Sequence, residues 1–195
     1  MKTKIYFVRH AQPDYRQGND STYSLSDEGI EDRMRAVEVL EKIHLDAAVS
    51  SPYKRSIETI MPCAEEHGLT IETDIRLRER DKGEGIPNNL EMFRKRWEDM
   101  HFCEKGGECL ADCQKRNIAA VNDILVKYEG KSVLVGTHGT ALSTIINHYD
   151  SSFGFKQFMR IIDFMPYVIC MKFDGSDYCG YEEMAYVEKE YHGKK

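Results

Sequence analysis

Short apolar runs alternate along the chain with longer segments in which apolar residues recur at helical spacing. The first run, Ile5 to Val8, consists of four successive large apolar residues, which is typical of a strand buried on both faces of a parallel sheet. Further strands are predicted at 46–50, 70–73 and 132–136, and a closing hairpin at 167–173 and 178–187. Helices are predicted at 26–40, 52–67, 87–100, 109–128 and 141–149. This order predicts an α/β fold.

Capping residues place several helix ends. Ser26 is expected to cap the first helix, whose apolar face includes Ile30 and Met34. Ser51-Pro52 is expected to supply the N-cap and first residue of the second helix. Pro62 is expected to kink or shorten that helix, and Gly68 to end it.

Length and composition indicate one ordinary globular domain. The 195 residues are 31% charged and 41% hydrophobic, and no run approaches the ~18 apolar residues that cross a bilayer. The polar start leads directly into the first strand, so no signal peptide is expected and a cytoplasmic location is predicted. The net charge of -6 argues against general binding to nucleic acid or a membrane surface. A basic pocket in an acidic protein would mark a local anion site.

The six cysteines favour reduced thiols over a disulfide framework, because no export signal and no Cys-x-x-Cys are present. His101, Cys103, Cys109 and Cys113 are residue types that bind zinc. Their spacing lacks the short paired knuckle of structural zinc sites, so no metal is expected.

Cationic or imidazole groups follow three of the predicted strands: Arg9-His10, Arg55 and His138. Each alone has an ordinary explanation as a surface arginine or a structural histidine. Together they would meet at the carboxyl edge of a parallel sheet, where α/β folds place their sites. Backbone amides from Gly139 onward would add a helix N-terminus suited to a phosphate. A ring of fixed donors around an imidazole is what phosphoryl transfer requires.

Four segments carry a resemblance to a known family. Arg9-His10-Ala11, Ser50 to Arg55, Leu77-Arg78-Glu79 and Thr137-His138-Gly139 resemble, in order and spacing, the signatures of the histidine phosphatase superfamily, branch 1, which includes the cofactor-dependent phosphoglycerate mutases. The resemblance spans residues 4 to about 150. It implies a three-layer α/β/α sandwich with a mostly parallel central sheet, similar to phosphoglycerate mutase, and a small phosphorylated substrate.

The resemblance also implies residue roles. His10 would be the nucleophile that forms a phosphohistidine, and Glu79 the general acid and base. Arg9, Arg55 and a protonated His138 would hold the phosphoryl group, and Gln12 and Gly139 would contact the substrate. No metal and no cofactor are implied. Without the resemblance, the chain gives no reason to choose Glu79 over Asp81 or Glu84.

The chain departs from the family pattern at several places. Ala11 replaces the usual glycine, and an alanine would be strained if the backbone φ were positive there. Arg16 replaces an asparagine of the mutase-like members. The segment between Glu79 and His138 is compact, which favours a phosphomonoester hydrolase over a phosphoglycerate mutase. A catalytically silent phosphate-binding module is the further alternative.

A single domain covering 1–195 is predicted, with an inserted lid at about 83–108. By composition alone, the charged run 76–84 is a solvated loop. Within the lid, Arg94, Lys95, Arg96 and Trp97 have two explanations. They either contact a second part of the substrate, or form a solvated basic face with Trp97 as its buried anchor. Neither the substrate nor the oligomeric state is predicted.

Overall fold

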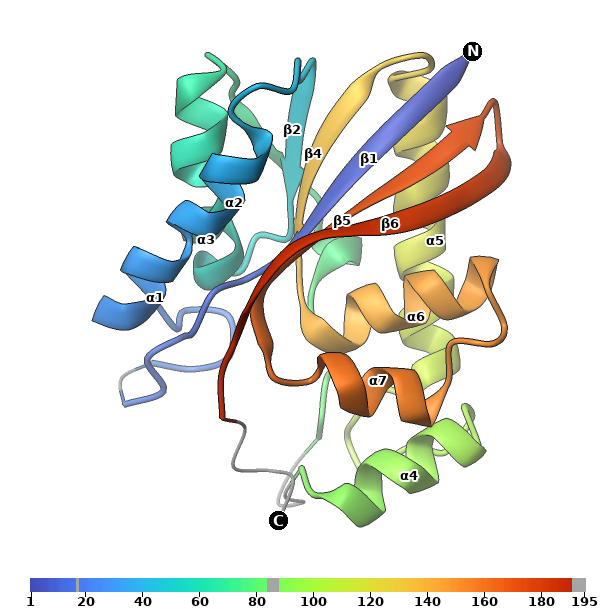
Figure 1. The fold of residues 1–195 in the computed structure, drawn as a ribbon. Coiled ribbons are helices and arrows are strands. Elements are labelled where there is room, and N and C mark those ends of the chain that lie inside the picture. Colours follow the sequence, from blue (N-terminus) through green and yellow to red (C-terminus); the bar gives the residue numbers. More distant parts are fainter. Residues whose placement is uncertain (17, 84–87, 191–195) are drawn as a thin grey trace.

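A six-stranded sheet forms the centre of the computed structural model, which describes residues 1–16, 18–83 and 88–190 (Figure 1). The strand order is β3-β2-β4-β1-β5-β6. The strands are β1 (Lys2–Arg9), β2 (Ala47–Ser50), β3 (Ile71–Thr73), β4 (Ser132–Thr137), β5 (Phe164–Asp174) and β6 (Asp177–Glu188). The first four along the chain are parallel to one another, whereas β5 is antiparallel to β1 and pairs with β6 as the predicted hairpin.

Helices cover both faces of this sheet (Figure 1). The helices are α1 (Asp27–Asp32), α2 (Met34–Leu40), α3 (Lys54–Glu66), α4 (Leu90–Glu98), α5 (Leu110–Lys127), α6 (Gly139–Tyr149) and α7 (Phe155–Ile161), with a short 3-10 helix, η1 (Ile75–Leu77). The first three lie on one side of the sheet, and α5, α6 and α7 lie on the other. The predicted three-layer α/β fold is therefore confirmed.

Strand β1 is buried on both faces, as its apolar run predicts. Ile5 and Phe7 belong to the core that includes residues of α5, α6 and α7. Tyr6 and Val8 belong to the second core, with residues of α2 and α3. Alternate side chains of one strand thus join the two cores.

The predicted helix at 26–40 is two helices. Ser26 caps α1 as expected, since its Oγ accepts a hydrogen bond from the Gly29 N–H at 3.0 Å. The chain then turns at Arg33 before α2. Ile30 and Met34 are exposed, so the expected apolar face was wrong at these two positions.

Helix α3 differs from its prediction at the start and in the middle. It begins at Lys54 with Tyr53, not Ser51, as N-cap. Pro62 does not shorten the helix, which continues to Glu66. A proline at this position leaves the Glu58 carbonyl without its helical donor. The Arg33 guanidinium donates to that carbonyl at 2.8 Å.

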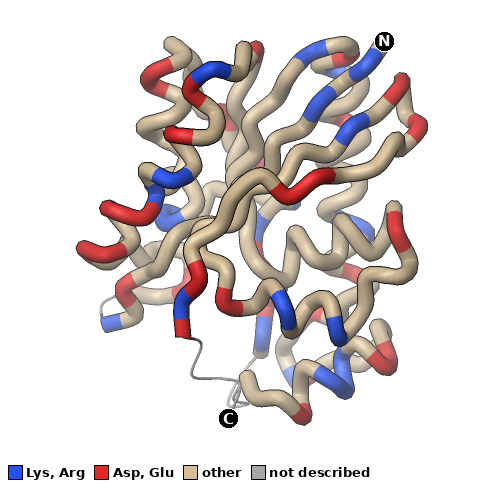
Figure 2. Tube along the Cα trace, viewed as in Figure 1, with Lys and Arg blue, Asp and Glu red and all other residues tan. Residues whose placement is uncertain are grey.

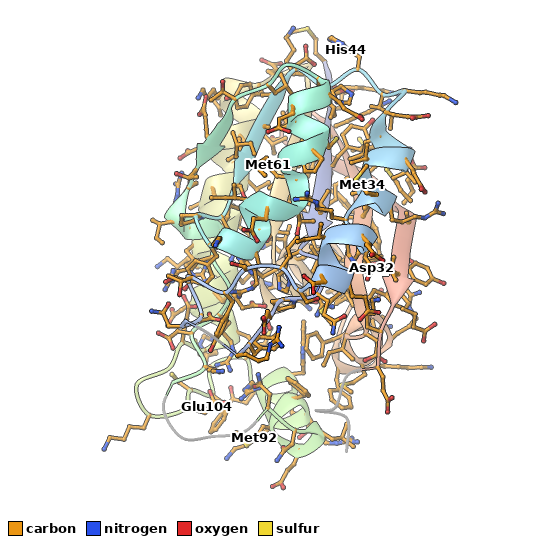
Figure 3. All side chains as sticks on the ribbon, turned by 90° about the vertical axis from the view of Figure 1, so that its left-hand side faces the viewer. Asp32, Met34, His44, Met61, Met92 and Glu104 are labelled. Atoms are coloured by element: carbon orange, nitrogen blue, oxygen red, sulfur yellow. The ribbon has the colours of Figure 1, made fainter. Side chains whose placement is uncertain are left out.

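Segment 83–108, the predicted lid, contains α4, which packs against α7 below the sheet (Figure 1). Figure 3 shows Met92 of α4 and Glu104 at the end of the molecule opposite His44. Helix α4 is shorter than predicted, and Pro87 lies outside the described residues. Helix α7 was not predicted.

Within the described ranges, no helix is both long and apolar enough to cross a membrane. All six cysteines are free. Among the same residues, no group of three or more His, Cys, Asp or Glu side chains could hold a metal ion.

Candidate active site

The ends of β1 and β4 bring two histidines together. The strands are parallel neighbours in which Arg9 is in register with Thr137, so His10 and His138 follow at the same edge. Their rings are 5.2 Å apart, edge to face. Arg55, in the first turn of α3, lies close enough to both imidazoles to lower their pKa values. The structure thus brings together the three groups that were predicted to meet at this edge of the sheet.

His10 is held in one tautomer. Its Nδ1 lies 2.7 Å from the Ala11 carbonyl oxygen, which can only accept, so Nδ1 carries the hydrogen. The Nε2 atom therefore keeps a lone pair. Burial, followed by the positive charges of Arg55 and Arg9, lowers the pKa of His10 well below its usual value. His10 is therefore neutral at pH 7, as a nucleophile must be.

Ala11 fits the site without strain. No described residue other than glycine has a positive φ. Ala11 is fully buried, and its backbone N–H donates to Thr59 Oγ1 at 3.0 Å. The replacement of glycine by alanine after the Arg-His pair is thus compatible with the fold.

His138 is fully buried, and its Nε2 lies 2.8 Å from Ser51 Oγ. Ser51 thus supports the imidazole instead of capping α3. Burial, then Arg55 and His10, lower the pKa of His138 well below its usual value. The two arginines and the burial thus favour the neutral form of His138, whereas the protonated form implied by the resemblance applies to a bound phosphoryl group and stays a prediction.

Arg9 is aimed by an element that the sequence analysis missed. Its Nη1 donates to the carbonyls of Ile161 and Ile162, at 2.9 and 3.0 Å, where α7 ends. On the other side, a Cβ at Gly139 would lie only 3.0 Å from Arg9 Cζ. Gly139 therefore gives the guanidinium room to lie against the start of α6.

Arg55 is held by Asp20, a residue that was also missed. Its side chain is buried and donates to both the backbone carbonyl and the carboxylate of Asp20, with Nη2 3.2 Å from Oδ1. Burial raises the pKa of Asp20 from its usual value. Nothing in the polar loop at 14–23 marked this residue, since one aspartate among several polar residues is an ordinary loop pattern.

The Glu79 carboxylate lies on the N-terminus of α6. Its oxygens accept hydrogen bonds from the N–H groups of Thr140 and Ala141 at 3.0 Å, and from that of Arg80 at 2.8 Å. Those two helix amides are therefore not open to a phosphate, contrary to expectation. The charged run at 76–84 is also not simply a solvated loop, because Arg80 is buried.

These groups surround a pocket of about 130 Å³. The predicted residues that line it are Arg9, His10, Arg55, Glu79 and Gly139. His138 is not among the lining residues, and its ring contacts that of His10 edge to face. Gln12 and Arg16 are not among the lining residues. The Gln12 carbonyl accepts from the Ser26 N–H, and Arg16 pairs with Asp14 on the surface.

Arg80 and Arg96 also line this pocket. Both are paired with the buried Glu104, and Arg96 Nη1 also donates to Asn88. Neither of the two explanations holds for all three of Arg94, Lys95 and Arg96. Arg94 and Lys95 are exposed and lie over the rings of Phe155 and Phe102, whereas Arg96 is buried in the wall. Trp97 packs against Phe153 and Phe158, as the anchor interpretation requires.

Outside the pocket, Figure 2 shows positive and negative residues interspersed over the helices and outer strands. The arginines that line the pocket thus belong to a chain whose charges are otherwise mixed.

Comparison with known proteins gives a consistent assignment. Residues 5–163 match the family described as the histidine phosphatase superfamily (branch 1). The chain is 30% identical over 162 residues to a 2,3-bisphosphoglycerate-dependent phosphoglycerate mutase of Afipia carboxidovorans, covering 73% of this chain and 78% of that protein. It is 28% identical over 148 residues to phosphoserine phosphatase 1 of Hydrogenobacter thermophilus, covering 69% and 70%.

The fold agrees with this assignment. The solved structure of YhfR from Bacillus stearothermophilus superposes with a TM-score of 0.76 at 24% identity, covering 98% of this chain and all of that one. The relatives thus include both a mutase and a phosphatase, which share chemistry on phosphate esters. From the family match over most of its length, the chain belongs to the histidine phosphatase superfamily, branch 1.

Proposed function

We propose that the chain is a phosphomonoester hydrolase that works through a phosphohistidine on His10. The observation that carries the proposal is the state of His10: neutral, held by the Ala11 carbonyl through Nδ1, and lining the pocket with its other nitrogen unprotonated. Such an imidazole is prepared for attack on phosphorus.

In the proposed first step, His10 Nε2 forms a bond to phosphorus as the bond to the ester oxygen breaks. Arg9, Arg55 and His138 hold the phosphoryl oxygens, and the dianion favours a protonated His138 once it is bound. Glu79, as the carboxylic acid, gives its proton to the departing oxygen. The products of this step are an alcohol, a phosphohistidine and the Glu79 carboxylate.

In the second step, the Glu79 carboxylate takes a proton from water as the water oxygen bonds to phosphorus. The bond between phosphorus and Nε2 breaks, and inorganic phosphate leaves. The cycle returns His10 to its neutral form and Glu79 to its acid form. It uses side chains of this chain only, so activity is expected to survive EDTA.

A phosphoglycerate mutase would use the same phosphohistidine but return the phosphate to a substrate. The experiment is to measure release of inorganic phosphate and interconversion of phosphoglycerate isomers with the same purified protein. We expect hydrolysis of p-nitrophenyl phosphate and no interconversion. Interconversion faster than phosphate release would identify a mutase, and phosphate binding without turnover would identify a silent module.

Phosphoserine and phosphoglycerate esters are the first compounds to test as natural substrates, because the relatives' names include them. A panel of phosphorylated metabolites would then show which chemical groups the pocket accepts beside Arg80 and Arg96.

A further inference from the structure

Residues 78–81, which carry Glu79, have no regular secondary structure of their own. The 3-10 helix η1 ends at Leu77, and the chain is then extended at Arg78. Carbonyls in such a segment need partners from elsewhere in the molecule. The position of Glu79 therefore depends on what holds this segment.

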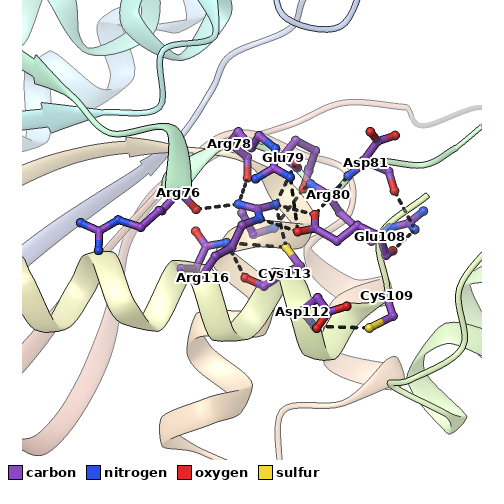
Figure 4. A network of polar contacts seen from close by, with 12 residues as sticks. Arg76, Arg78, Glu79, Arg80, Asp81, Glu108, Cys109, Asp112, Cys113 and Arg116 are labelled. Carbon is purple, nitrogen blue, oxygen red and sulfur yellow. Dashed lines mark hydrogen bonds and ion pairs between the residues drawn. The ribbon is translucent and has the colours of Figure 1, made fainter. Parts of the chain in front are cut away.

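The Arg116 guanidinium of α5 supplies those partners (Figure 4). Its Nη1 donates to the carbonyls of Arg76 at 2.6 Å and Arg78 at 2.7 Å, and its Nη2 donates to the carbonyl of Glu79 itself at 3.0 Å. One side chain thus ties three carbonyls, on and before Glu79, to the 18-residue helix α5.

Glu108 holds Arg116 in place and completes the attachment. It accepts from Arg116 Nε at 2.6 Å and Nη2 at 2.7 Å, a two-pronged pair whose side chains are 13% and 12% exposed. The backbone N–H of Glu108 donates to the Asp81 carbonyl at 2.8 Å, and its carbonyl accepts from Arg80 Nη1 at 2.7 Å. Residues on both sides of Glu79 are therefore anchored at the same place.

Arg116 is not among the residues that line the pocket. Every N–H of its guanidinium is used by these bonds, so none is left for a phosphoryl oxygen. Its hydrogen bonds therefore bear on the reaction through Glu79, whose carboxylate reaches the start of α6 from the segment that Arg116 holds.

We propose that Arg116, locked by Glu108, is the residue that positions the Glu79 acid and base for catalysis. The inference rests on the proposed role of Glu79. A general acid contributes only when its proton is within reach of the leaving oxygen, and a small displacement can remove most of that contribution. A lysine could not replace the fork, because an ammonium lacks its planar set of donors.

The test uses the dependence of kcat/KM on the leaving group. Dinitrophenyl phosphate needs little protonation of its leaving oxygen, whereas phenyl phosphate needs much more. We expect Arg116→Gln to lower kcat/KM for phenyl phosphate by at least about 10-fold more than for dinitrophenyl phosphate. Arg116→Lys should give the same selective loss to a smaller extent, and competitive inhibition by inorganic phosphate should stay within about 2-fold in both.

Arg76→Gln is the matched control. It is an arginine of the same segment, but its side chain pairs with Asp74 and Asp123 on the surface, away from Glu79 (Figure 4). This variant should leave kcat/KM unchanged for both phenyl phosphate and dinitrophenyl phosphate. Glu79→Gln, measured alongside, should show the full selective loss.

Each result is decisive. Equal losses for the two esters in Arg116→Lys, or no loss in either Arg116 variant, would overturn the inference, and the lysine variant decides if the glutamine variant does not fold. If Glu79→Gln itself shows no selectivity, the proposed role of Glu79 fails. If only the Arg116 variants lack selectivity, the proposed function stands and the positioning role falls.

Discussion

At the residue scale, single neighbours decide what each reactive group can do. The Ala11 carbonyl fixes the tautomer of His10, and Ser51 holds the neighbouring His138. Gly139 influences Arg9 by having no side chain, since a Cβ there would contact the guanidinium. We therefore expect one methyl group at Gly139 to disturb the position of Arg9.

Gly139→Ala should weaken phosphate binding while the fold persists. The added Cβ would lie 3.0 Å from Arg9 Cζ and 3.1 Å from Nε, so the guanidinium must move away from its present position. We expect the inhibition constant of inorganic phosphate to rise by about 10-fold, as for the loss of one charge-assisted hydrogen bond. Gly154→Ala is the control, because a Cβ there meets nothing within 4 Å. Equal inhibition constants for the two variants would contradict the account.

At the element scale, a buried ion triad joins α4 and the loop after it to the Glu79 segment. Arg80 and Arg96 share Glu104, and the side chains of all three are at most 4% exposed. Removing one member of such a group leaves charge buried without its partner, which costs more than the interaction contributes.

Glu104→Gln should therefore lower the free energy of unfolding by about 3–5 kcal/mol, measured by urea denaturation. Glu183→Gln provides the comparison, since its partner Arg160 is half exposed and such pairs contribute at most about 1 kcal/mol. Similar losses in the two variants would mean that the triad contributes no more to the free energy of unfolding than a surface ion pair does.

The elements differ in how far the sequence predicts them. Strong apolar runs, such as 5–8 and 132–136, predict their strands, because burial on both faces requires them. Helix α7 lacks a comparable pattern over its seven residues. The motifs name the five proposed catalytic residues, whereas Asp20 and Arg116 are joined to them by contacts across the fold, which spacing along the chain does not encode.

At the scale of the whole molecule, the fold buries two neutral imidazoles side by side at the sheet edge. Burial and the nearby arginines lower the pKa of both His10 and His138. The unfolded chain therefore binds protons at these positions more readily than the folded one. Their contribution to stability is complete above the ordinary histidine pKa of about 6.5 and is lost as the pH falls below it.

The free energy of unfolding should thus fall as the pH is lowered from about 7 to about 5.5, by about 2–3 kcal/mol from this pair. Urea denaturation of the wild type and of a His10→Asn, His138→Asn double variant measures this contribution. The double variant should lose correspondingly less stability over the same interval. An identical pH dependence in both proteins would mean that the two histidines are not held neutral.

The covalent intermediate is the central claim, and trapping it is the most direct measurement. The protein is mixed with a radiolabelled phosphate ester, quenched rapidly in alkaline denaturant, and digested to locate the label. The account predicts an acid-labile, alkali-stable label on His10 that is absent from His10→Ala. A turning-over enzyme with no such label, or with the label on another residue, would contradict it.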